Sequence, residues 1–348
     1  MRAITFQGIG DLRVRDVPEP RIVDPRDALV RVERTAICGS DLHVFHGRER
    51  GLDLGTVMGH EFVGTVVELG PAVACLRPGD RVASPFSTSC GRCYFCTRGL
   101  TSRCVQGSLF GWIEAGRGLG GAQAEFVRVP HADTTLFRLP PDVALDEAVL
   151  LTDVLPTGFH AVEQADPSPG DLVVILGAGP VGLCALIALL ARGVREGLVL
   201  DPVPERRELA RRLGGNAHAL EGDGGAAAVR RASEGRGADA VIEAVGNAAA
   251  LRLAIDCLRP GGTLSAIGVH DEDSFAFSPA EAYAKNLTFR SGRAPARIYM
   301  ERLLPWLASH RAEFAALLSH RLPLEEGPQG YRIFDEKREG CTKVLLVP

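Results

Sequence analysis

The stretch LVVILGAGPVGLCALIALLA, residues 172–191, contains no charged residue and decides the fold of this chain. It is long enough for a membrane-spanning helix. However, three glycines and Pro180 interrupt it. Strand-forming residues 173–175 precede the glycines, and the alanine- and leucine-rich residues 184–191 favour a helix. The stretch therefore predicts a buried strand, a glycine turn and a buried helix rather than a membrane span.

The glycines of this stretch form the pattern G-x-G-x-x-G with Gly177, Gly179 and Gly182, and Pro180 and Val181 lie between the last two. The first glycine allows a tight turn, the second lets a pyrophosphate approach the backbone, and the third lets helix and strand pack closely. The helix N-terminus then faces the phosphates. The pattern predicts a dinucleotide-binding turn at these five residues, with an ordinary strand–helix turn as the alternative.

Asp201 follows Gly182 by 19 residues, at the end of the next predicted strand. A carboxylate at this place accepts hydrogen bonds from the adenosine ribose and repels a 2′-phosphate. It favours NAD over NADP. Arg206 and Arg207 argue the other way, because an arginine close by can bind the 2′-phosphate, although both also fit a solvated helix face. We expect Arg206 to contact the cofactor.

The residues that follow the glycine turn alternate between strand and helix patterns. Strands are predicted in EGLVLD (196–201), ADAVIEAVG (238–246) and TLSAIGV (263–269), and helices in PERRELARRLGG (204–215) and NAAALRLAIDCLRPGG (247–262). Such alternation predicts a doubly wound parallel sheet with helices on both faces.

The flanking parts of the chain have a different character, with short alternating runs bounded by Gly, Pro and Asp. Strands are predicted in ALVRVERTAI (28–37), EFVGTVVELG (61–70), GDRVASPF (79–86) and TKVLLVP (342–348). We therefore expect an α/β protein in which residues 1–153 and 291–348 form a β-rich domain, and an α/β domain of residues 154–290 is inserted into it.

Composition excludes several classes of protein. The 39 basic and 43 acidic side chains give a net charge of −4, which provides no electrostatic reason to expect nucleic acid or an anionic membrane as partner. The N-terminus has no apolar export signal, so we expect the reducing cytoplasm. There, clustered cysteines more often bind metal than form disulfides.

Four of the nine cysteines, Cys90, Cys93, Cys96 and Cys104, lie within 15 residues in the spacing C-x2-C-x2-C-x7-C. Four thiolates in so short a loop can close a tetrahedral zinc site, and a site with four protein ligands is structural rather than catalytic. A disulfide pair and an iron–sulfur cluster are the alternatives.

A second set of metal-binding residue types is spread over three segments. Cys38 begins CGSDLH, His60 and Glu61 lie in MGHEFVG, and Asp153 lies in LLTDVLPTGFH. Catalytic zinc takes three protein ligands and keeps an exchangeable position, and Cys, His and carboxylate side chains are all suitable. The spacing alone is a moderate signal for such a site.

The combination of CGSDLH, GHEFVG, the four-cysteine segment and LGAGPVG resembles the zinc-containing medium-chain dehydrogenase/reductase family of alcohol dehydrogenases. The order and spacing of the motifs match from about residue 25 to the C-terminus. The resemblance implies a GroES-like catalytic domain, an inserted Rossmann domain, and a zinc ion in the cleft between them.

The resemblance also implies the roles of the second metal set. Cys38 and His60 match the first two zinc ligands, Asp153 matches the third, and Glu61 matches a glutamate that can enter the coordination shell. Aspartate at the third position is similar to bacterial secondary alcohol dehydrogenases and to the formaldehyde-dehydrogenase-like branch.

Further positions match residues that handle protons or cofactor in the family. Ser40 matches the hydroxyl that relays the substrate proton, and His43 the histidine that passes it toward solvent. Asp41 matches the carboxylate that supports the ligands, Thr157 the residue beside the nicotinamide, and Lys343 a basic side chain that contacts the pyrophosphate.

We therefore expect a zinc-dependent oxidoreductase that transfers hydride between NAD and an alcohol, a polyol or an aldehyde hydrate. Two zinc ions per chain and a homo-oligomer, tetramer or dimer, belong to this expectation. A sorbitol- or threonine-type dehydrogenase is the nearest alternative, although these more often use glutamate as third ligand. A zinc-free quinone or enoyl reductase and a non-catalytic nucleotide-binding protein are the more distant alternatives.

Overall fold

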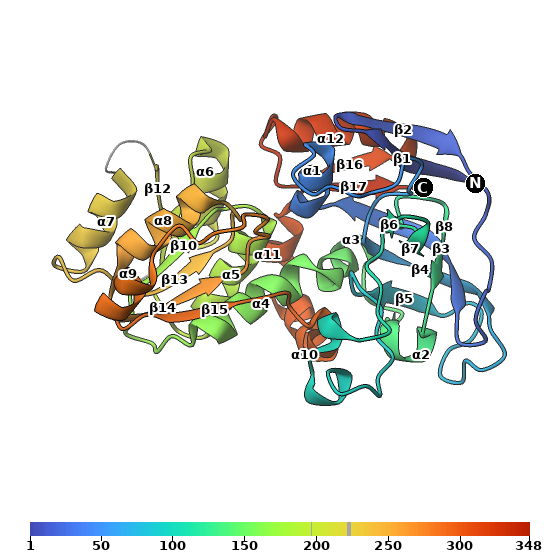
Figure 1. The fold of residues 1–348 in the computed structure, drawn as a ribbon, viewed down its shortest axis with the longest axis horizontal. Helices are drawn as coiled ribbons and strands as arrows, with labels where there is room; N and C mark the ends of the chain where they lie inside the picture. The colour runs from blue at the N-terminus through green and yellow to red at the C-terminus, as the bar shows by residue number, and fades with distance from the viewer. Residues whose placement is uncertain (196, 221–223) are drawn as a thin grey trace. The chain divides into compact units, whose positions relative to one another are not determined.

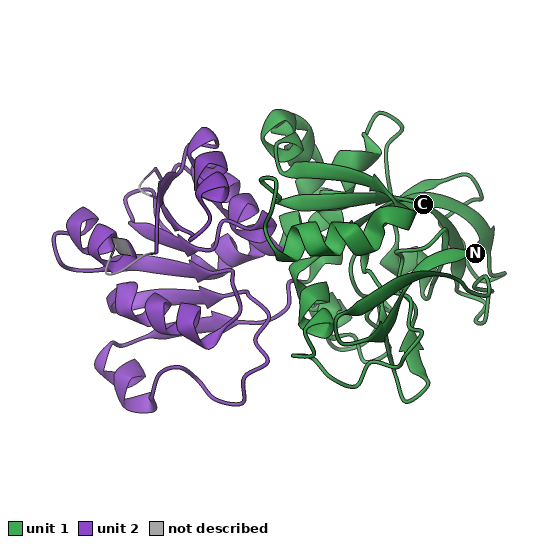
Figure 2. Cartoon of the chain, turned by 90° about the horizontal axis from the view of Figure 1, so that it is seen from above, with its two compact units in different colours: residues 1–156, 295–348 green, residues 157–294 purple. Residues whose placement is uncertain are grey.

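The computed structural model describes residues 1–195, 197–220 and 224–348. The chain divides into two compact units, one formed by Met1–Pro156 with Pro295–Pro348 and the other by Thr157–Ala294 (Figure 2). The two junctions lie three and four residues after those expected from the sequence, at 156/157 and 294/295 instead of 153/154 and 290/291. The second unit is thus an insertion into the first.

The second unit is built on a parallel sheet with the strand order β12-β11-β10-β13-β14-β15 (Figure 1). Its strands are β10 (Val173–Leu176), β11 (Gly197–Leu200), β12 (Asn216–His218), β13 (Ala238–Glu243), β14 (Leu258–Ala266) and β15 (Thr288–Ser291). Its helices are α5 (Pro180–Ala191), α6 (Pro204–Arg212), α7 (Gly224–Ala232), α8 (Ala248–Cys257) and α9 (Pro279–Ala284). Helix α4 (Val154–Ala165) begins in the first unit and continues into the second. The expected doubly wound sheet is confirmed.

The uncharged stretch 172–191 is the centre of this unit. Strand β10 is buried at all four positions, and eight residues of helix α5 are buried. A helix that is apolar all round packs inside a protein as well as in a membrane. Among the described residues, no helix is long and apolar enough to cross a membrane.

The order of the strands reverses between β10 and β13, so their carboxyl ends form the switch point at which doubly wound sheets bind ligands. Right-handed crossovers place α5 and α6 on one face of the sheet and α7 and α8 on the other. The glycine turn begins at Gly177, directly after β10. The fold therefore puts the predicted phosphate turn at this edge.

Several element boundaries in this unit differ from the expectation; helix α8, for example, ends at Cys257 rather than at Gly262. Strand β14 begins at Leu258, five residues earlier than predicted, because Leu258 already pairs with Ala238 of β13 and a register shift before Thr263 accommodates the Pro-Gly-Gly sequence. The sequence patterns above do not predict β12, α7 and β15. The first residue of the predicted strand 196–201, Glu196, lies outside the described residues.

The first unit contains a mixed sheet with the order β16-β17-β3-β4-β5-β9, and β8 also pairs with β3. Its strands are β3 (Ala28–Ile37), β4 (Glu61–Leu69), β5 (Arg81–Ser84), β8 (Phe126–Val129), β9 (Phe137–Arg138), β16 (Leu318–Pro323) and β17 (Lys343–Val347), with hairpins β1 (Arg2–Gly8)–β2 (Asp11–Asp16) and β6 (Trp112–Glu114)–β7 (Arg117–Leu119). Its helices are α1 (Gly39–Phe45), α2 (Ala132–Thr135), α3 (Leu145–Ala148), α10 (Ala296–Ser309), α11 (Arg311–Ala315) and α12 (Gly327–Asp335), with 3-10 turns η1 (Cys96–Arg98), η2 (Thr101–Arg103), η3 (Val149–Thr152) and η4 (Leu324–Glu326).

The strand pairing of this unit brings distant segments of the chain to one end of β3. Ala36 of β3 pairs with Glu61 of β4, and Ile37 pairs with Val344 of the C-terminal strand β17. Residues that are hundreds of positions apart in sequence therefore lie side by side where β3 ends and α1 begins.

Candidate metal centre and cofactor turn

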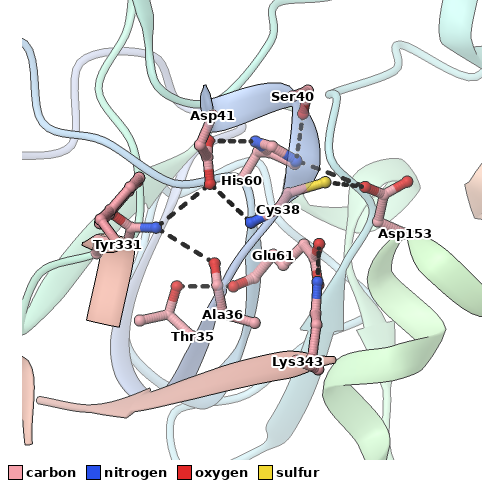
Figure 3. Close-up of polar contacts among 11 residues, drawn as sticks. Thr35, Ala36, Cys38, Ser40, Asp41, His60, Glu61, Asp153, Tyr331 and Lys343 are labelled. Atoms are coloured by element: carbon pink, nitrogen blue, oxygen red, sulfur yellow. Dashed lines mark hydrogen bonds and ion pairs between the residues drawn. The ribbon is translucent and has the colours of Figure 1, made fainter. Parts of the chain in front are cut away.

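Three chain segments bring the second metal set together at the end of β3. Cys38 links β3 to α1 in an extended conformation, His60 directly precedes β4, and Asp153 follows η3. The Cys38 Sγ lies 3.4 Å from Asp153 Oδ2, and His60 Nε2 lies 3.5 Å from the same oxygen (Figure 3). With Glu61 included, one donor atom from each residue lies within 4.8 Å of every other.

The chemistry of this set fits a divalent cation. Burial, together with the charges of Asp153 and Glu61, raises the pKa of the Cys38 thiol to about 11, so a metal ion is needed to hold it as thiolate. Burial lowers the pKa of His60, but the charge of Asp41, together with hydrogen bonds to Asp153 and Asp41, raises it well above 6.5. Glu61 Oε2 is buried and has no hydrogen-bond partner. Sulfur, imidazole and carboxylate donors at these positions suit zinc.

Asp41 orients His60 for such a role. Asp41 Oδ1 lies 3.3 Å from His60 Nδ1, and its Oδ2 accepts a hydrogen bond from the Cys38 backbone N–H at 2.9 Å (Figure 3). A proton on Nδ1 leaves the lone pair of Nε2 facing Cys38 and Asp153, and this arrangement of carboxylate, histidine and metal is common at zinc sites.

The two residues expected in the proton relay lie on helix α1 beside this set. Ser40 Oγ lies 3.4 Å from His60 Nε2, and His43 is buried three residues further along the same helix. Positions i and i+3 share a helix face. Thr157, the residue expected beside the nicotinamide, belongs to the second unit and lies on α4.

Lys343 has a different partner from the pyrophosphate that the resemblance implies. Its Nζ lies 2.5 Å from Glu61 Oε1, and both side chains have 0% exposed surface (Figure 3). Burial lowers the pKa of Lys343, but the charge of Glu61 and the hydrogen bond to it act in the opposite direction, and the pKa is raised. The pKa of Glu61 is also raised, because burial outweighs the lysine. The charge of Lys343 therefore compensates the carboxylate of Glu61 in the metal set.

The four-cysteine segment forms a separate cluster in the first unit. The sulfur atoms of the four cysteines lie within 4.8 Å of one another, and none of the four forms a disulfide bond. The Cys93 and Cys104 sulfurs are 3.9 Å apart, about twice the length of a disulfide bond. Backbone N–H groups of Cys96 and Val105 lower the pKa of Cys93 to about 6. Amide groups turned toward thiolates fit a closed zinc site.

The glycine turn of the second unit has the geometry that its sequence predicts. Gly177 has a φ of +93°, which only glycine adopts readily, and a Cβ on Gly182 would lie 1.8 Å from the Gly177 carbonyl oxygen. Pro180 is in the first turn of the 12-residue helix α5, followed by Val181. The N-terminus of this helix therefore adjoins an open turn that an anion can approach.

Asp201 is fixed at the end of β11 by two backbone hydrogen bonds. Its oxygens accept from the N–H groups of Ala178 and Val203, both at 2.7 Å. Arg207 donates to the carbonyl oxygens of Asp201 and Pro202. The Arg206 Nη1 lies 3.8 Å from the position that a Cβ of Gly179 would take. Asp201 and Arg206 therefore both adjoin the phosphate turn.

Sequence reasoning did not single out two further residues that support the metal set, Gln123 and Tyr331. The Tyr331 hydroxyl donates to Gln123 Oε1 at 2.8 Å, and Gln123 Nε2 donates to the Ala36 carbonyl at 3.2 Å and to Asp41 Oδ2 at 3.5 Å. Neither residue has a motif around it, and the two are 208 positions apart. No spacing rule could have connected them.

Comparisons with known proteins agree with this geometry. Residues 24–141 match the family model "Alcohol dehydrogenase GroES-like domain", and residues 180–309 match "Zinc-binding dehydrogenase". "Zinc-type alcohol dehydrogenase B" of Aspergillus flavus is 41% identical over 343 residues, which are 96% of this chain and 79% of that protein. The chain belongs to the zinc-containing alcohol dehydrogenase family. The family resemblance inferred from the motifs is thus confirmed.

Two further relatives show that the likeness extends over the whole chain. The protein "Uncharacterized zinc-type alcohol dehydrogenase-like protein AdhB" of Bacillus subtilis is 36% identical over an alignment of 384 positions. The alignment covers 100% of this chain and 100% of that protein. The solved structure of "Alcohol dehydrogenase TADH from Thermus sp. ATN1" has a TM-score of 0.92 and 42% identity, covering 100% of this chain and 99% of that chain. The first unit is accordingly a GroES-like domain and the second a Rossmann domain, as expected, and the protein is an oxidoreductase of this family.

Proposed function

We propose that this dehydrogenase oxidises an alcohol, a polyol or the hydrate of an aldehyde with NAD as hydride acceptor, or catalyses the reverse reaction. The observation that carries the proposal is the convergence of Cys38, His60, Glu61 and Asp153 within 4.8 Å, with the Ser40 hydroxyl 3.4 Å from His60. Zinc, when bound there, supplies a Lewis acid that acidifies an alcohol, and the nicotinamide supplies the redox chemistry.

The side chains of the site have separate roles in binding the metal and in transferring the proton. Cys38, His60 and Asp153 hold the metal, and Asp41 keeps His60 oriented through Nδ1. We propose that Ser40 takes the hydroxyl proton of the substrate and that the proton then passes toward His43, three residues further along the same helix. A relay of this kind contributes typically 10²–10⁴-fold to rate. Glu61 stays beside the metal set through its pairing with Lys343.

The arrangement around the glycine turn supports NAD rather than NADP. Gly177, Gly179 and Gly182 open the turn to a pyrophosphate, and Asp201 lies 3% exposed at the end of β11 with both oxygens fixed. A negative charge held there disfavours a 2′-phosphate. Arg206 is close enough to the turn to contact a phosphate of the cofactor.

Asp153 supports a substrate of the formaldehyde-dehydrogenase-like branch, where an aspartate at this position is the third ligand. The proposal includes an exchangeable NAD. A sorbitol- or threonine-type activity is the alternative within the family.

The proposal extends to self-association and location. Strand β15 is an edge of the parallel sheet, and near it Phe275 is 63% exposed and Tyr283 86%. The edge strand of a sheet, with exposed aromatic side chains beside it, fits a homo-oligomeric contact in a dimer or tetramer. The proposal places the protein in a reducing compartment such as the cytoplasm, where a metal-binding cluster of thiols such as Cys90, Cys93, Cys96 and Cys104 stays reduced.

A substrate panel tests the activity. The zinc-loaded protein is incubated with NAD or NADP and with primary alcohols, secondary alcohols, polyols and formaldehyde, and the reduced cofactor is followed by absorbance. We expect turnover with at least one substrate and a larger kcat/KM with NAD than with NADP. Turnover restricted to sorbitol-like polyols or to threonine would favour the alternative, and no turnover on any member would contradict the proposal.

A further inference from the structure

We infer that Gln123 and Tyr331 are positioning residues for the metal set, acting through Asp41 on His60. The inference rests on the proposed function, because it assigns a role to residues behind the proposed zinc site. The chain of contacts runs from the Tyr331 hydroxyl to the Gln123 amide, to the Asp41 carboxylate, and to the imidazole of His60.

The orientation of the Gln123 amide follows from its neighbours. The backbone carbonyl of Ala36 can only accept a hydrogen bond, so the amide nitrogen of Gln123 faces it at 3.2 Å. The amide oxygen then faces Tyr331. Burial and the charge of Asp41 raise the pKa of the Tyr331 phenol well above 10, so its hydroxyl is protonated and donates. The same amide nitrogen lies 3.5 Å from Asp41 Oδ2.

The direction of donation continues to the metal ligands. Asp41 Oδ2 accepts hydrogen bonds from the backbone N–H of Cys38 and the side-chain amide of Gln123. Its other oxygen is left for His60 Nδ1 (Figure 3). A carboxylate that is 4% exposed would otherwise lack donors for its charge. Fixing Asp41 fixes the His60 tautomer, and the unprotonated Nε2 then faces Cys38 and Asp153.

The backbone of the Gln123 segment holds the residues before His60 as well. Gln123 donates its N–H to the Met58 carbonyl at 2.8 Å, and Ala122 donates to the Gly59 carbonyl at 2.9 Å. A Cβ on Gly59 would lie 2.4 Å from Gln123 Cγ, so the two segments are in close contact. Gln123 thus contacts the peptide that leads into His60 and the carboxylate that orients it.

Complete burial makes these contacts sensitive to substitution. Gln123 and Tyr331 are both 0% exposed, and water does not replace a lost partner at such a position. Tyr331 comes from helix α12 and Gln123 from the loop before β8, whereas Asp41 lies on α1. The contacts of Tyr331, Gln123 and Asp41 therefore connect three separate segments of the first unit to one proposed zinc ligand, His60.

The experiment compares metal binding by Tyr331→Phe and Gln123→Met with the wild type, and uses Tyr299→Phe as matched control. Tyr299 is a buried tyrosine of the same unit on α10, so its variant removes a tyrosine hydroxyl from a different helix than the one that carries Tyr331. Zinc affinity is measured by chelator competition, and the site at Cys38 is followed by the absorption of substituted Co²⁺. Thermal unfolding checks that each variant is folded.

We expect the zinc held by the Cys38 set to bind roughly 3- to 10-fold more weakly in Tyr331→Phe, as for the loss of one buried hydrogen bond. In Gln123→Met the loss approaches the 10- to 100-fold typical of groups that orient zinc ligands. The Co²⁺ bands shift in both variants. The zinc of the four-cysteine site is retained in both, and Tyr299→Phe behaves as the wild type.

Unchanged zinc affinity and Co²⁺ bands in Tyr331→Phe and Gln123→Met would overturn the inference. Equal weakening of both zinc sites would also overturn it, since that result indicates a general packing role. If Gln123→Met does not fold, the Tyr331→Phe comparison decides, because that variant removes one oxygen only. A wild type that binds zinc but oxidises no alcohol would contradict the proposed function and leave this comparison intact.

Discussion

Among single residues, Lys343 and Glu61 show how strongly the metal centre depends on compensation of charge. Both side chains are fully buried, and their charged atoms are 2.5 Å apart. Removing one partner of a buried ion pair leaves the other charge without compensation, which typically costs 3–5 kcal/mol. Replacing both partners by neutral groups removes that penalty. The buried charge of each residue is therefore compensated only by the charge of the other.

Lys343→Met should lower the free energy of unfolding by about 3 kcal/mol, and the double variant Lys343→Met/Glu61→Gln should recover at least half of this loss. Denaturant titration of the metal-saturated protein measures both values. Glu325→Gln is a suitable control because Glu325 is exposed and paired only at the surface. Equal losses in the single and double variants would show that the charge of Glu61 does not cause the effect.

Among the elements, β10 and α5 can pack closely because Gly182 has no side chain. A Cβ there would lie 1.8 Å from the Gly177 carbonyl oxygen and 3.0 Å from its carbon, and both atoms are backbone. The helix would have to move away from the strand, and the phosphate turn would move with it. The cost of such overpacking is about 1–3 kcal/mol.

Gly182→Ala should therefore weaken NADH binding at least roughly tenfold, which corresponds to about 1.4 kcal/mol, and lower stability. Gly197→Ala in β11 is the matched control, because a Cβ there meets open space. Cofactor affinity is measured by fluorescence titration. NADH binding by Gly182→Ala as tight as that of the control would contradict the assignment of this turn.

A second pair of elements, the ends of β13 and β14, is linked by His270. Its Nε2 lies 2.9 Å from Glu243 Oε2 and its Nδ1 3.1 Å from Glu272 Oε2. The hydrogen bond to Glu243 is the main cause that raises the pKa of His270 above 6.5. A raised pKa in the folded state stabilises the fold fully below the unfolded value, and this contribution is lost as the pH rises through the folded value.

The stability difference between wild type and His270→Gln should accordingly be larger at pH 6 than at pH 9, by about 0.5–1 kcal/mol after allowance for solvent screening. Denaturant midpoints at the two pH values provide the measurement. A difference that is constant or grows with pH would show that the two carboxylates do not hold the protonated imidazole.

Across the whole molecule, local patterns were predictable and long-range pairings were not. The strand–turn–helix at 172–191 and the four-cysteine cluster are each decided within a short segment, so their sequence was sufficient. Lys343 meets Glu61 across 282 positions, and Tyr331 meets Gln123 across 208. Such contacts depend on the order of strands in the sheet, because β17 and β4 both pair with β3. No propensity or spacing in the sequence encodes that order.

The two proposed zinc sites also differ in how far apart in the sequence their ligands lie. Both lie in the first unit and use different chain segments, Cys90–Cys104 for one and the ends of β3, β4 and η3 for the other. The closed site has four sulfur donors from one loop, so it stabilises that loop, whereas the other set assembles only when the sheet has formed. Their losses should therefore be separable.

The most direct test of the account is the zinc content per chain of the wild type, of Cys38→Ala and of Cys93→Ala, measured with alcohol-dependent NAD reduction on the same samples. The account predicts two zinc ions and activity in the wild type. Cys38→Ala should keep one zinc and its fold but lose activity by at least about 10²-fold, while Cys93→Ala should lose the other zinc and unfold at a lower temperature. A wild type with fewer than two zinc ions after loading, or an active Cys38→Ala, would contradict it.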